Sequence, residues 1–174
     1  MAWLDDLTSF VRGAVSGFVG EYSSPSAYTP SAHAPPRATF QSVIQHLASE
    51  FNADVHWDED GDMGAALGMH LQGDYRMVMV FFADGRAHLY APSNIKFAPG
   101  CLPRDIAAFL VRRNKELDFA DWDAVNKNGK ACFTLRSHGP LDRITLDTLK
   151  VAIKKMLIES ATLDSYLRKE GYVA

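Results

Sequence analysis

The stretch RMVMVFFADGRAHLYAP at residues 76–92 decides the fold, because it places two β-type runs on either side of an Asp84-Gly85 pair. Branched, sulfur-containing and aromatic side chains fill the first run, and apolar residues alternate with polar ones in the second. An Asp-Gly pair between two such runs is a strong signal for a two-residue hairpin turn. We therefore predict antiparallel strands at 75–82 and 86–91.

Two further hairpin signals lie on either side of this one. A Gly-Asp pair at 73–74 ends an apolar run, which predicts a strand at 65–72. An Asn-Gly pair joins runs at 122–127 and 130–137, and this is the clearest turn signal of the chain. The sequence thus predicts one three-stranded and one two-stranded antiparallel unit.

Apolar residues spaced by three and four predict the helices around these strands. One helix begins with Thr39 as its cap, one runs from Pro103 to about Asp118, and one spans 144–169. The expected order is α-β-β-β-α-β-β-α, counted from the helix at Thr39 and leaving out a short strand near Val55. This order predicts an α+β fold, an antiparallel sheet with helices packed on it.

The first 38 residues differ from this domain in composition. Residues 21–38 are rich in Ser, Pro and Ala and are expected to be a linker. Residues 1–20 carry apolar side chains at helical spacing, which predicts an amphipathic N-terminal helix, although three glycines weaken it. Such a helix is marginal alone and needs a surface to dock on. We expect the α+β domain to cover 39–170.

Charge and cysteine content exclude several classes of function. A net charge of −3 and a pI near 6.0 argue against a nucleic-acid partner, which would require a basic stripe. Cys101 and Cys132 form neither a disulfide framework nor a metal motif, so a reducing cytoplasm is expected. Asp5 and Asp6 interrupt the apolar start, which argues against a signal peptide and disfavours membrane contact.

The predicted hairpins sort side chains onto two faces, because paired residues share a face. A turn at 73–74 pairs His70 with Met77, and the turn at Asp84-Gly85 pairs Phe81 with His88. One face is then aliphatic and belongs under the helices: Leu67, Met69, Leu71, Val78, Val80, Phe82, Ala87 and Leu89. The other face mixes apolar bodies with polar tips: His70, Gln72, Tyr75, Met77, Met79, Phe81, His88 and Tyr90.

The mixed face has two interpretations. Met-rich and aromatic surfaces can repack around varied partners, which makes this face a candidate surface for a protein partner or a homodimer. Its candidate partner-binding residues are His70, Tyr75, Met77, Met79, Phe81, His88 and Tyr90. Alternatively, another part of the same chain covers it, such as the N-terminal helix. The sequence leaves both interpretations open.

The later hairpin and the last helix also have two sides of different character. In the later hairpin, Trp122, Ala124, Phe133 and Leu135 are expected in the core. The opposite side, with Cys132 and Thr134, is expected to face solvent. On the last helix, Ile144, Val151 and Ile158 recur every seven residues on the side opposite the core stripe. Exposed apolar lines can mark contacts, so Val151 and Ile158 join the candidate partner-binding residues.

The sequence offers no convincing active site. None of the six histidines forms a ligand pair with metal-site spacing, and the acidic run at 58–62 fails the pattern of a calcium loop. There is no nucleophile elbow, phosphate-binding loop or dinucleotide fingerprint. We therefore predict no catalytic residue, metal or cofactor. The alternatives are a small enzyme of unknown class, or a peripheral membrane protein attached through residues 2–20.

Three segments, at 76–92, 102–138 and 146–167, resemble in pattern the type III secretion chaperone-like fold, and most closely its YbjN-like bacterial proteins. The resemblance covers about 39–170. It implies a cytoplasmic bacterial protein without cofactor, often dimeric. Members of the secretion-chaperone branch hold an extended segment of a partner along their surfaces, and the YbjN-like branch is linked to stress and regulation. The expected function is a non-enzymatic protein-binding module, chaperone-like or a regulatory adaptor.

Overall fold

The computed structural model describes residues 37–58, 63–71, 73–98, 100–127 and 129–172, so the expected N-terminal helix and most of the expected linker lie outside the described residues. The elements follow in this order: α2 (Arg37–Phe51), β1 (Asp54–Trp57), β2 (Gly64–Leu71), β3 (Asp74–Ala83), β4 (Arg86–Pro92), α3 (Arg104–Arg113), β5 (Asp121–Lys127), β6 (Lys130–Pro140), a short 3-10 helix (Leu141–Arg143) and α4 (Leu146–Lys169). Helix α2 begins at Arg37, so Thr39 is not its cap and the last two residues of the expected linker are helical.

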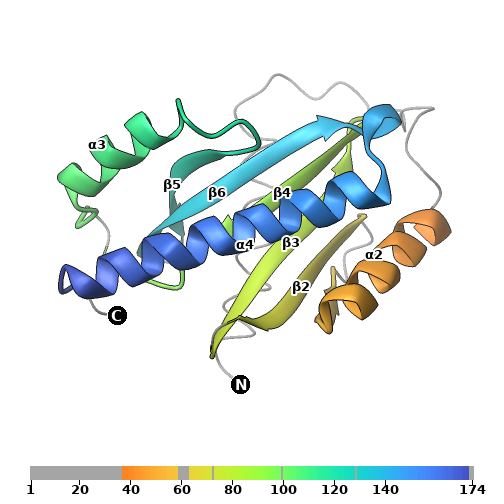
Figure 1. The fold of residues 1–174 in the computed structure, drawn as a ribbon, viewed down its shortest axis with the longest axis horizontal. Helices are drawn as coiled ribbons and strands as arrows, with labels where there is room; N and C mark the ends of the chain where they lie inside the picture. The colour runs from red at the N-terminus through yellow and green to blue at the C-terminus, as the bar shows by residue number, and fades with distance from the viewer. Residues whose placement is uncertain (1–36, 59–62, 72, 99, 128, 173–174) are drawn as a thin grey trace.

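The strands form one six-stranded sheet in the order β1-β2-β3-β4-β6-β5 (Figure 1). Every neighbouring pair is antiparallel. The two predicted units join because β4 pairs with β6. These two strands are neighbours in the sheet although α3 and β5 lie between them along the chain. The predicted α+β class and element order are confirmed, with the short strand near Val55 added as the edge strand β1.

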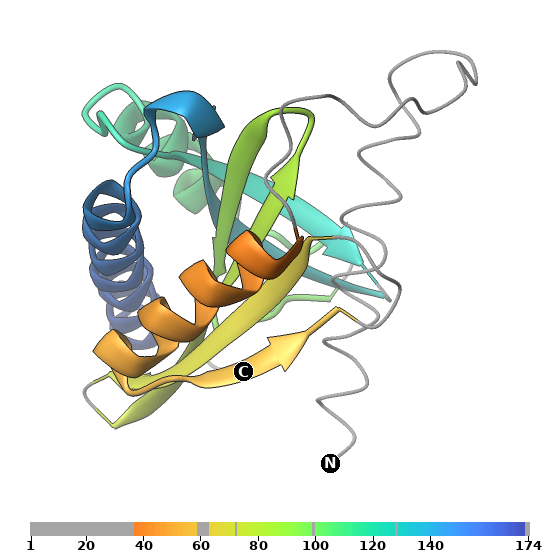
Figure 2. The ribbon, with the colours of Figure 1, turned by 90° about the vertical axis from the view of Figure 1, so that its right-hand side faces the viewer.

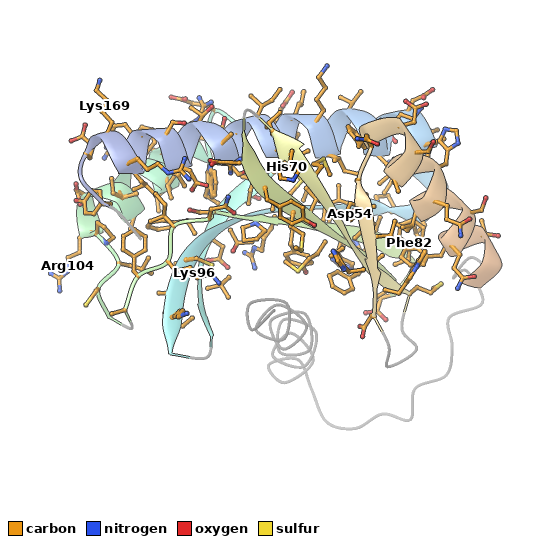
Figure 3. All side chains as sticks on the ribbon, turned by 90° about the horizontal axis from the view of Figure 1, so that it is seen from below. Asp54, His70, Phe82, Lys96, Arg104 and Lys169 are labelled. Carbon is orange, nitrogen blue, oxygen red and sulfur yellow. The ribbon has the colours of Figure 1, made fainter. Side chains whose placement is uncertain are left out.

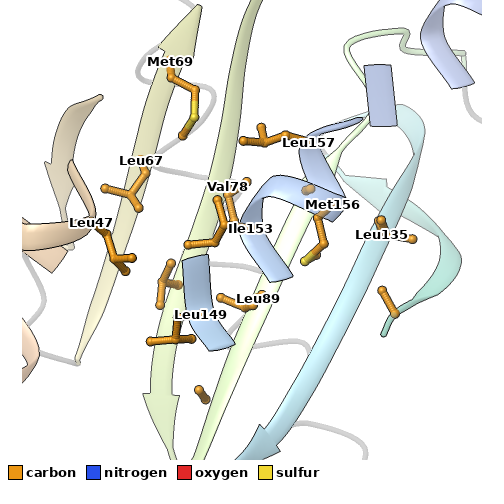
Figure 4. Packing of buried hydrophobic residues seen from close by; sticks show 14 of the residues in the cluster. Leu47, Leu67, Met69, Val78, Leu89, Leu135, Leu149, Ile153, Met156 and Leu157 are labelled. Atoms are coloured by element: carbon orange, nitrogen blue, oxygen red, sulfur yellow. The ribbon is translucent and has the colours of Figure 1, made fainter. Parts of the chain in front are cut away.

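Helices α2 and α4 lie on the same side of the sheet (Figure 2). Among the described residues, no helix lies over the opposite face (Figures 2 and 3). The core therefore fills the space between the helices and one sheet face, where Leu47 of α2 and Ile153 of α4 meet Leu67, Val78 and Leu89 (Figure 4). All five side chains are buried, as expected for an aliphatic face under helices.

The strand register corrects one predicted turn and confirms the other. His70 pairs with Tyr75 and not with Met77, so the first hairpin turns one position earlier than expected. This shifts the pairing by two residues, and an even shift leaves every side chain on its predicted face. The second hairpin has the predicted pairs, Phe81 with His88 and Met79 with Tyr90.

A buried ionic network that no sequence pattern predicted fastens α4 to the sheet. Arg76 lies on the helix side of β3, and its Nη1 is 2.9 Å from Oδ2 of Asp164 on α4. The two side chains are 3% and 0% exposed, so this pair is removed from water. Asp164 also accepts hydrogen bonds from the Ser93 hydroxyl and from the backbone N–H of Asn94, at 2.9 Å for the latter.

Helix α3 is shorter than expected and is held by polar contacts. It ends at Arg113, whose guanidinium forms two hydrogen bonds with Glu159 of α4, at 2.9 and 3.0 Å. These bonds hold the pKa of the Glu159 carboxyl below its ordinary value. The side chain of Asn114 then bonds the backbone of Trp122 through both its oxygen and its nitrogen. Phe109 is 43% exposed, because α3 turns Ile106 and Leu110 to the core instead.

Candidate protein-binding surfaces

One set of candidate residues gathers on the sheet face that lies away from α2 and α4, here called the open face. The structure brings together all seven residues predicted for it, His70, Tyr75, Met77, Met79, Phe81, His88 and Tyr90, because the register of β2, β3 and β4 places them on one side. Met79 stands at the centre of this group, with Ala66 of β2 on one flank and Tyr90 of β4 on the other.

Two glycines of β2 shape the open face, a role that the strand pattern did not predict. A Cβ atom at Gly68 would lie 1.8 Å from the Tyr75 hydroxyl, and one at Gly64 would lie 2.8 Å from the Phe81 ring. Both aromatic rings therefore lie across β2, in space that only glycine leaves free. The Tyr75 hydroxyl also lies 3.4 Å from Nε2 of His56 on β1. The signal in the sequence was the spacing of two glycines by four within a strand.

The centre of the open face is buried and its rim is not. Met77, Met79 and Phe81 are 6%, 1% and 7% exposed and form one cluster with Ala66. Tyr75 and Tyr90 are half-buried and pack against this cluster. His88 is half-buried and His70 is exposed. The face thus consists of an apolar centre with polar groups around it.

The open face continues across β4 onto β6. The rings of His88 and His138 stack with centroids 6.2 Å apart, and Arg136 pairs with Asp123 at 3.0 Å. Cys132 and Thr134 were expected to face solvent, but they are 6% and 1% exposed. The expectation was wrong because the hairpin is not isolated: β6 also pairs with β4 at Thr134, and Ala131, next to Cys132, forms a bridge with Phe97. Burial raises the pKa of the Cys132 thiol.

A second candidate surface lies on the outer side of α4. Val151 and Ile158 are 55% and 51% exposed, and Tyr166, at 43%, continues the same side of the helix toward its end. We call these three residues the helix stripe. Tyr166 stacks on Phe109 of α3 with ring centroids 6.0 Å apart. Ile144 does not belong to the stripe, because it precedes α4 and packs half-buried against the core.

The described residues show no assembled catalytic or metal site. They contain no group of three or more His, Cys, Asp or Glu that could hold a metal ion. A half-open groove of about 680 Å³ lies between α2, the β3–β4 turn and the start of α4. Its described lining is mostly apolar, with the carboxylates of Asp84 and Asp142 as its charged groups and no histidine. Its described lining therefore contains no Ser-His or Cys-His pair of the kind that activates a nucleophile.

Membrane attachment can be examined only for the described helices. None of them is long and apolar enough to cross a membrane. The peripheral attachment considered for residues 2–20 concerns a segment outside the described residues.

The open face predicts a pH dependence of stability through His88. Burial, followed by the nearby His138 and Arg86, lowers the pKa of His88 below its ordinary value of 6.5. The unfolded chain then takes up this proton before the folded chain does, so stability falls as the pH drops below about 6.5. Melting temperatures at about pH 7 and about pH 5 should differ less in His88→Gln than in wild type. His70→Gln, at an exposed position, is the control. If the melting temperature falls equally between the two pH values in both variants, this role of His88 is contradicted.

Comparisons with known proteins bear on the fold alone. No family model and no curated protein sequence matches the chain. A chain of a solved structure, described as "Structure of the HopA1-SchA Chaperone-Effector Complex", is similar with a TM-score of 0.52 and 11% sequence identity. The similarity covers 74% of this chain and 95% of that chain. It supports the expected chaperone-like fold without favouring the YbjN-like branch. The described domain therefore shares its fold with a chain of a chaperone-effector complex.

Proposed function

We propose that the protein is a non-enzymatic protein-binding module, a chaperone-like or regulatory adaptor, and that its binding surface is the open face. One observation carries this proposal: Met77, Met79 and Phe81 form an apolar ladder on the sheet face that no described helix covers. An antiparallel sheet that turns one face to water ordinarily carries polar side chains there. An apolar face of this kind is suited to burial against another polypeptide.

The composition of the open face indicates what kind of partner it takes. Met77 and Met79 have flexible, polarisable side chains that adapt to differently shaped apolar groups. Tyr75 and Tyr90 flank them and combine an apolar ring with a hydroxyl, the combination that is enriched at protein interfaces. We therefore propose as partner a protein segment with a row of apolar side chains, such as an amphipathic helix. Its polar side would remain in water.

A substitution at Tyr90 tests this function. Tyr90→Glu places a charge at a half-buried position on the open face, so it should abolish partner binding with less damage to the fold than a charge at the buried Met79. The measurement is affinity capture of the full chain from its native cell, with quantitative mass spectrometry. Val111→Glu on α3 is the control, because Val111 is 64% exposed and lies off this face. Equal partner recovery from Tyr90→Glu and wild type would contradict the proposal.

The helix stripe is where we propose that a second copy of the chain binds. Val151 and Ile158 are the exposed aliphatic side chains of α4, and a homodimer would bury them. Light scattering on the full chain as it elutes from a size-exclusion column should give a mass near twice 19.2 kDa. Ile158→Asp should return it to the mass of one chain, whereas Lys169→Asp, at the end of α4, should not. A single-chain mass for wild type would refute the homodimer and leave the open face unaffected.

We place the protein in the cytoplasm, in keeping with its thiols. Cys101 is exposed and Cys132 is buried, and both are free. Free thiols persist in the reducing cytoplasm, whereas secreted proteins of this size commonly pair their cysteines. Fractionation of the native cell with an antibody to the chain checks this placement, and recovery from the secreted fraction would contradict it.

A further inference from the structure

We propose that in the free protein residues 2–20 of the same chain dock on the open face and cover Met77, Met79 and Phe81. This inference rests on the proposed function in one respect, since it assigns an internal occupant to the surface that a partner would use. It goes further by naming what a partner has to displace. Docking of the chain on itself holds or fails independently of any partner.

The burial of β3 is the first argument. Seven consecutive residues of this strand, 76–82, are buried, so side chains on both faces are withdrawn from water. The helices α2 and α4 account for the face that carries Val78 and Val80. On the other face Met79 is 1% exposed, although no described helix lies there. A strand buried on both faces belongs to a sheet covered on both faces, so a further segment is required.

The shape of the open face is the second argument. Gly64, Ala66 and Gly68 carry little or no side chain, and the rings of Phe81 and Tyr75 lie across them. The surface over β2 is therefore formed by two aromatic rings, which suits it to the apolar side of a helix. Residues 2–20 would span about 28 Å as a helix. The ten residues of β3 span about 33 Å, so the two elements match in length.

The sequence of residues 2–20 is the third argument. It places Trp3, Leu7, Phe10, Ala14 and Phe18 at spacings of three and four, which gives a helix with one apolar side. A helix of this length is marginal in water, and its three glycines weaken it further. It needs an apolar surface to form, and the open face has no other described occupant. Docking would bury the apolar side of residues 2–20 and the open face together.

The attachment point of the segment is the fourth argument. The described chain starts at Arg37, and Phe40 contacts Phe82 and Trp57, so the beginning of α2 lies near the edge strand β1. Passing round this edge to the centre of the open face requires about 20 Å, which is one sheet thickness and two strand spacings. The sixteen residues at 21–36 have an average span of about 20–24 Å as a flexible chain. The segment therefore reaches the face without strain.

Docking within the chain has a consequence for partner binding. A segment tethered this closely acts at an effective concentration of millimolar order, so moderate intrinsic affinity suffices to keep the face covered. A partner then competes with residues 2–20, and its apparent affinity falls by the fraction of chains with the face uncovered. Segment 2–20 thus serves as an internal competitor that admits only partners with a stronger apolar row.

Methionine oxidation of the full chain tests the docking. In wild type, hydrogen peroxide should convert Met77 and Met79 to sulfoxides slowly, as it does the core residues Met69 and Met156. Phe10→Asp should raise the rates at Met77 and Met79 about tenfold or more, which corresponds to a docking free energy of about 1.4 kcal/mol. Met69 and Met156, buried under the helices, should keep their rates. Unchanged rates at Met77 and Met79 would overturn the proposal.

A photo-cross-link in the otherwise unaltered chain keeps the proposal testable if Phe10→Asp disturbs folding. A benzophenone side chain in place of Tyr90, in purified protein, should link to residues 2–20, and the same group in place of Phe109 should not. A mixture of light and heavy-isotope chains shows whether the link is within one chain. Links between two chains, links to other segments, or no links would each overturn the docking. None of these results depends on a partner, so loss of partners in Tyr90→Glu remains a separate test of the function.

Discussion

Asp164→Ala should lower the free energy of unfolding by about 3–5 kcal/mol, because it leaves the guanidinium of Arg76 buried without its main carboxylate. The Arg76 side chain is 3% exposed, so water cannot replace the lost carboxylate. Its Nε already has no hydrogen-bond partner among the described residues. Asp74, 3.3 Å from Nη2, supplies only partial compensation. Ser93 and the N–H of Asn94 lose their acceptor as well. Urea unfolding followed by circular dichroism measures the change.

The control for this prediction removes both charges. Arg76→Met combined with Asp164→Leu should be markedly more stable than Asp164→Ala, because it leaves no buried charge without a partner. The comparison separates the free-energy cost of a buried unpaired charge from the stabilisation that the ion pair itself provides. A loss below about 1 kcal/mol in Asp164→Ala, the range of an exposed ion pair, would show that Arg76 reaches water.

Gly68→Ala should destabilise the protein by about 1–3 kcal/mol, because the added methyl group would meet the Tyr75 hydroxyl at 1.8 Å. Replacing a glycine within a strand ordinarily stabilises by about 0.5–1 kcal/mol, so the predicted sign is reversed here by the clash. The ring of Tyr75 must leave its place over β2 to relieve it. Urea unfolding gives the magnitude, and faster oxidation of the adjacent Met77 would report the displaced ring.

Two further variants isolate the clash at Gly68. In a Tyr75→Ala background, Gly68→Ala should cost little or nothing, so a double-mutant cycle should give a coupling energy of about the full single-mutant loss. Gly139→Ala on β6 is the matched control, since its Cβ would lie 3.4 Å from the flexible end of Ile144. Additive effects at positions 68 and 75 would mean that Tyr75 does not lie over Gly68.

The turns and faces of the sheet could be predicted from the sequence because they depend on local rules. The Asp84-Gly85 pair takes positive φ values of 52° and 70°, as the predicted turn requires. The strand period of two then sorts Met79 and Val80 onto opposite faces whatever the exact turn position. The pairing in the first hairpin differs by two residues from the predicted pairing, and the candidate site is unchanged for this reason.

Other features depend on contacts distant in the chain and could not be predicted. Arg76 looked like an ordinary polar residue in a strand, and its partner Asp164 lies 88 residues away on α4. The burial of Thr134 follows from the pairing of β6 with β4, which no local pattern specifies. The centre of the open face was predicted as a surface by composition. Its degree of burial could not be predicted, because strand patterns do not reveal what lies against a sheet face.

The central claim is that the open face binds a partner protein, and photo-cross-linking in the native cell tests it most directly. The full chain should carry the benzophenone side chain in place of Tyr90, with the same group in place of Val111, which is 64% exposed, as the control. The account predicts that irradiation joins the chain to another protein from position 90, through a peptide with a row of apolar side chains, and not from position 111. The same adducts from both positions, or no protein adduct from position 90, would contradict it.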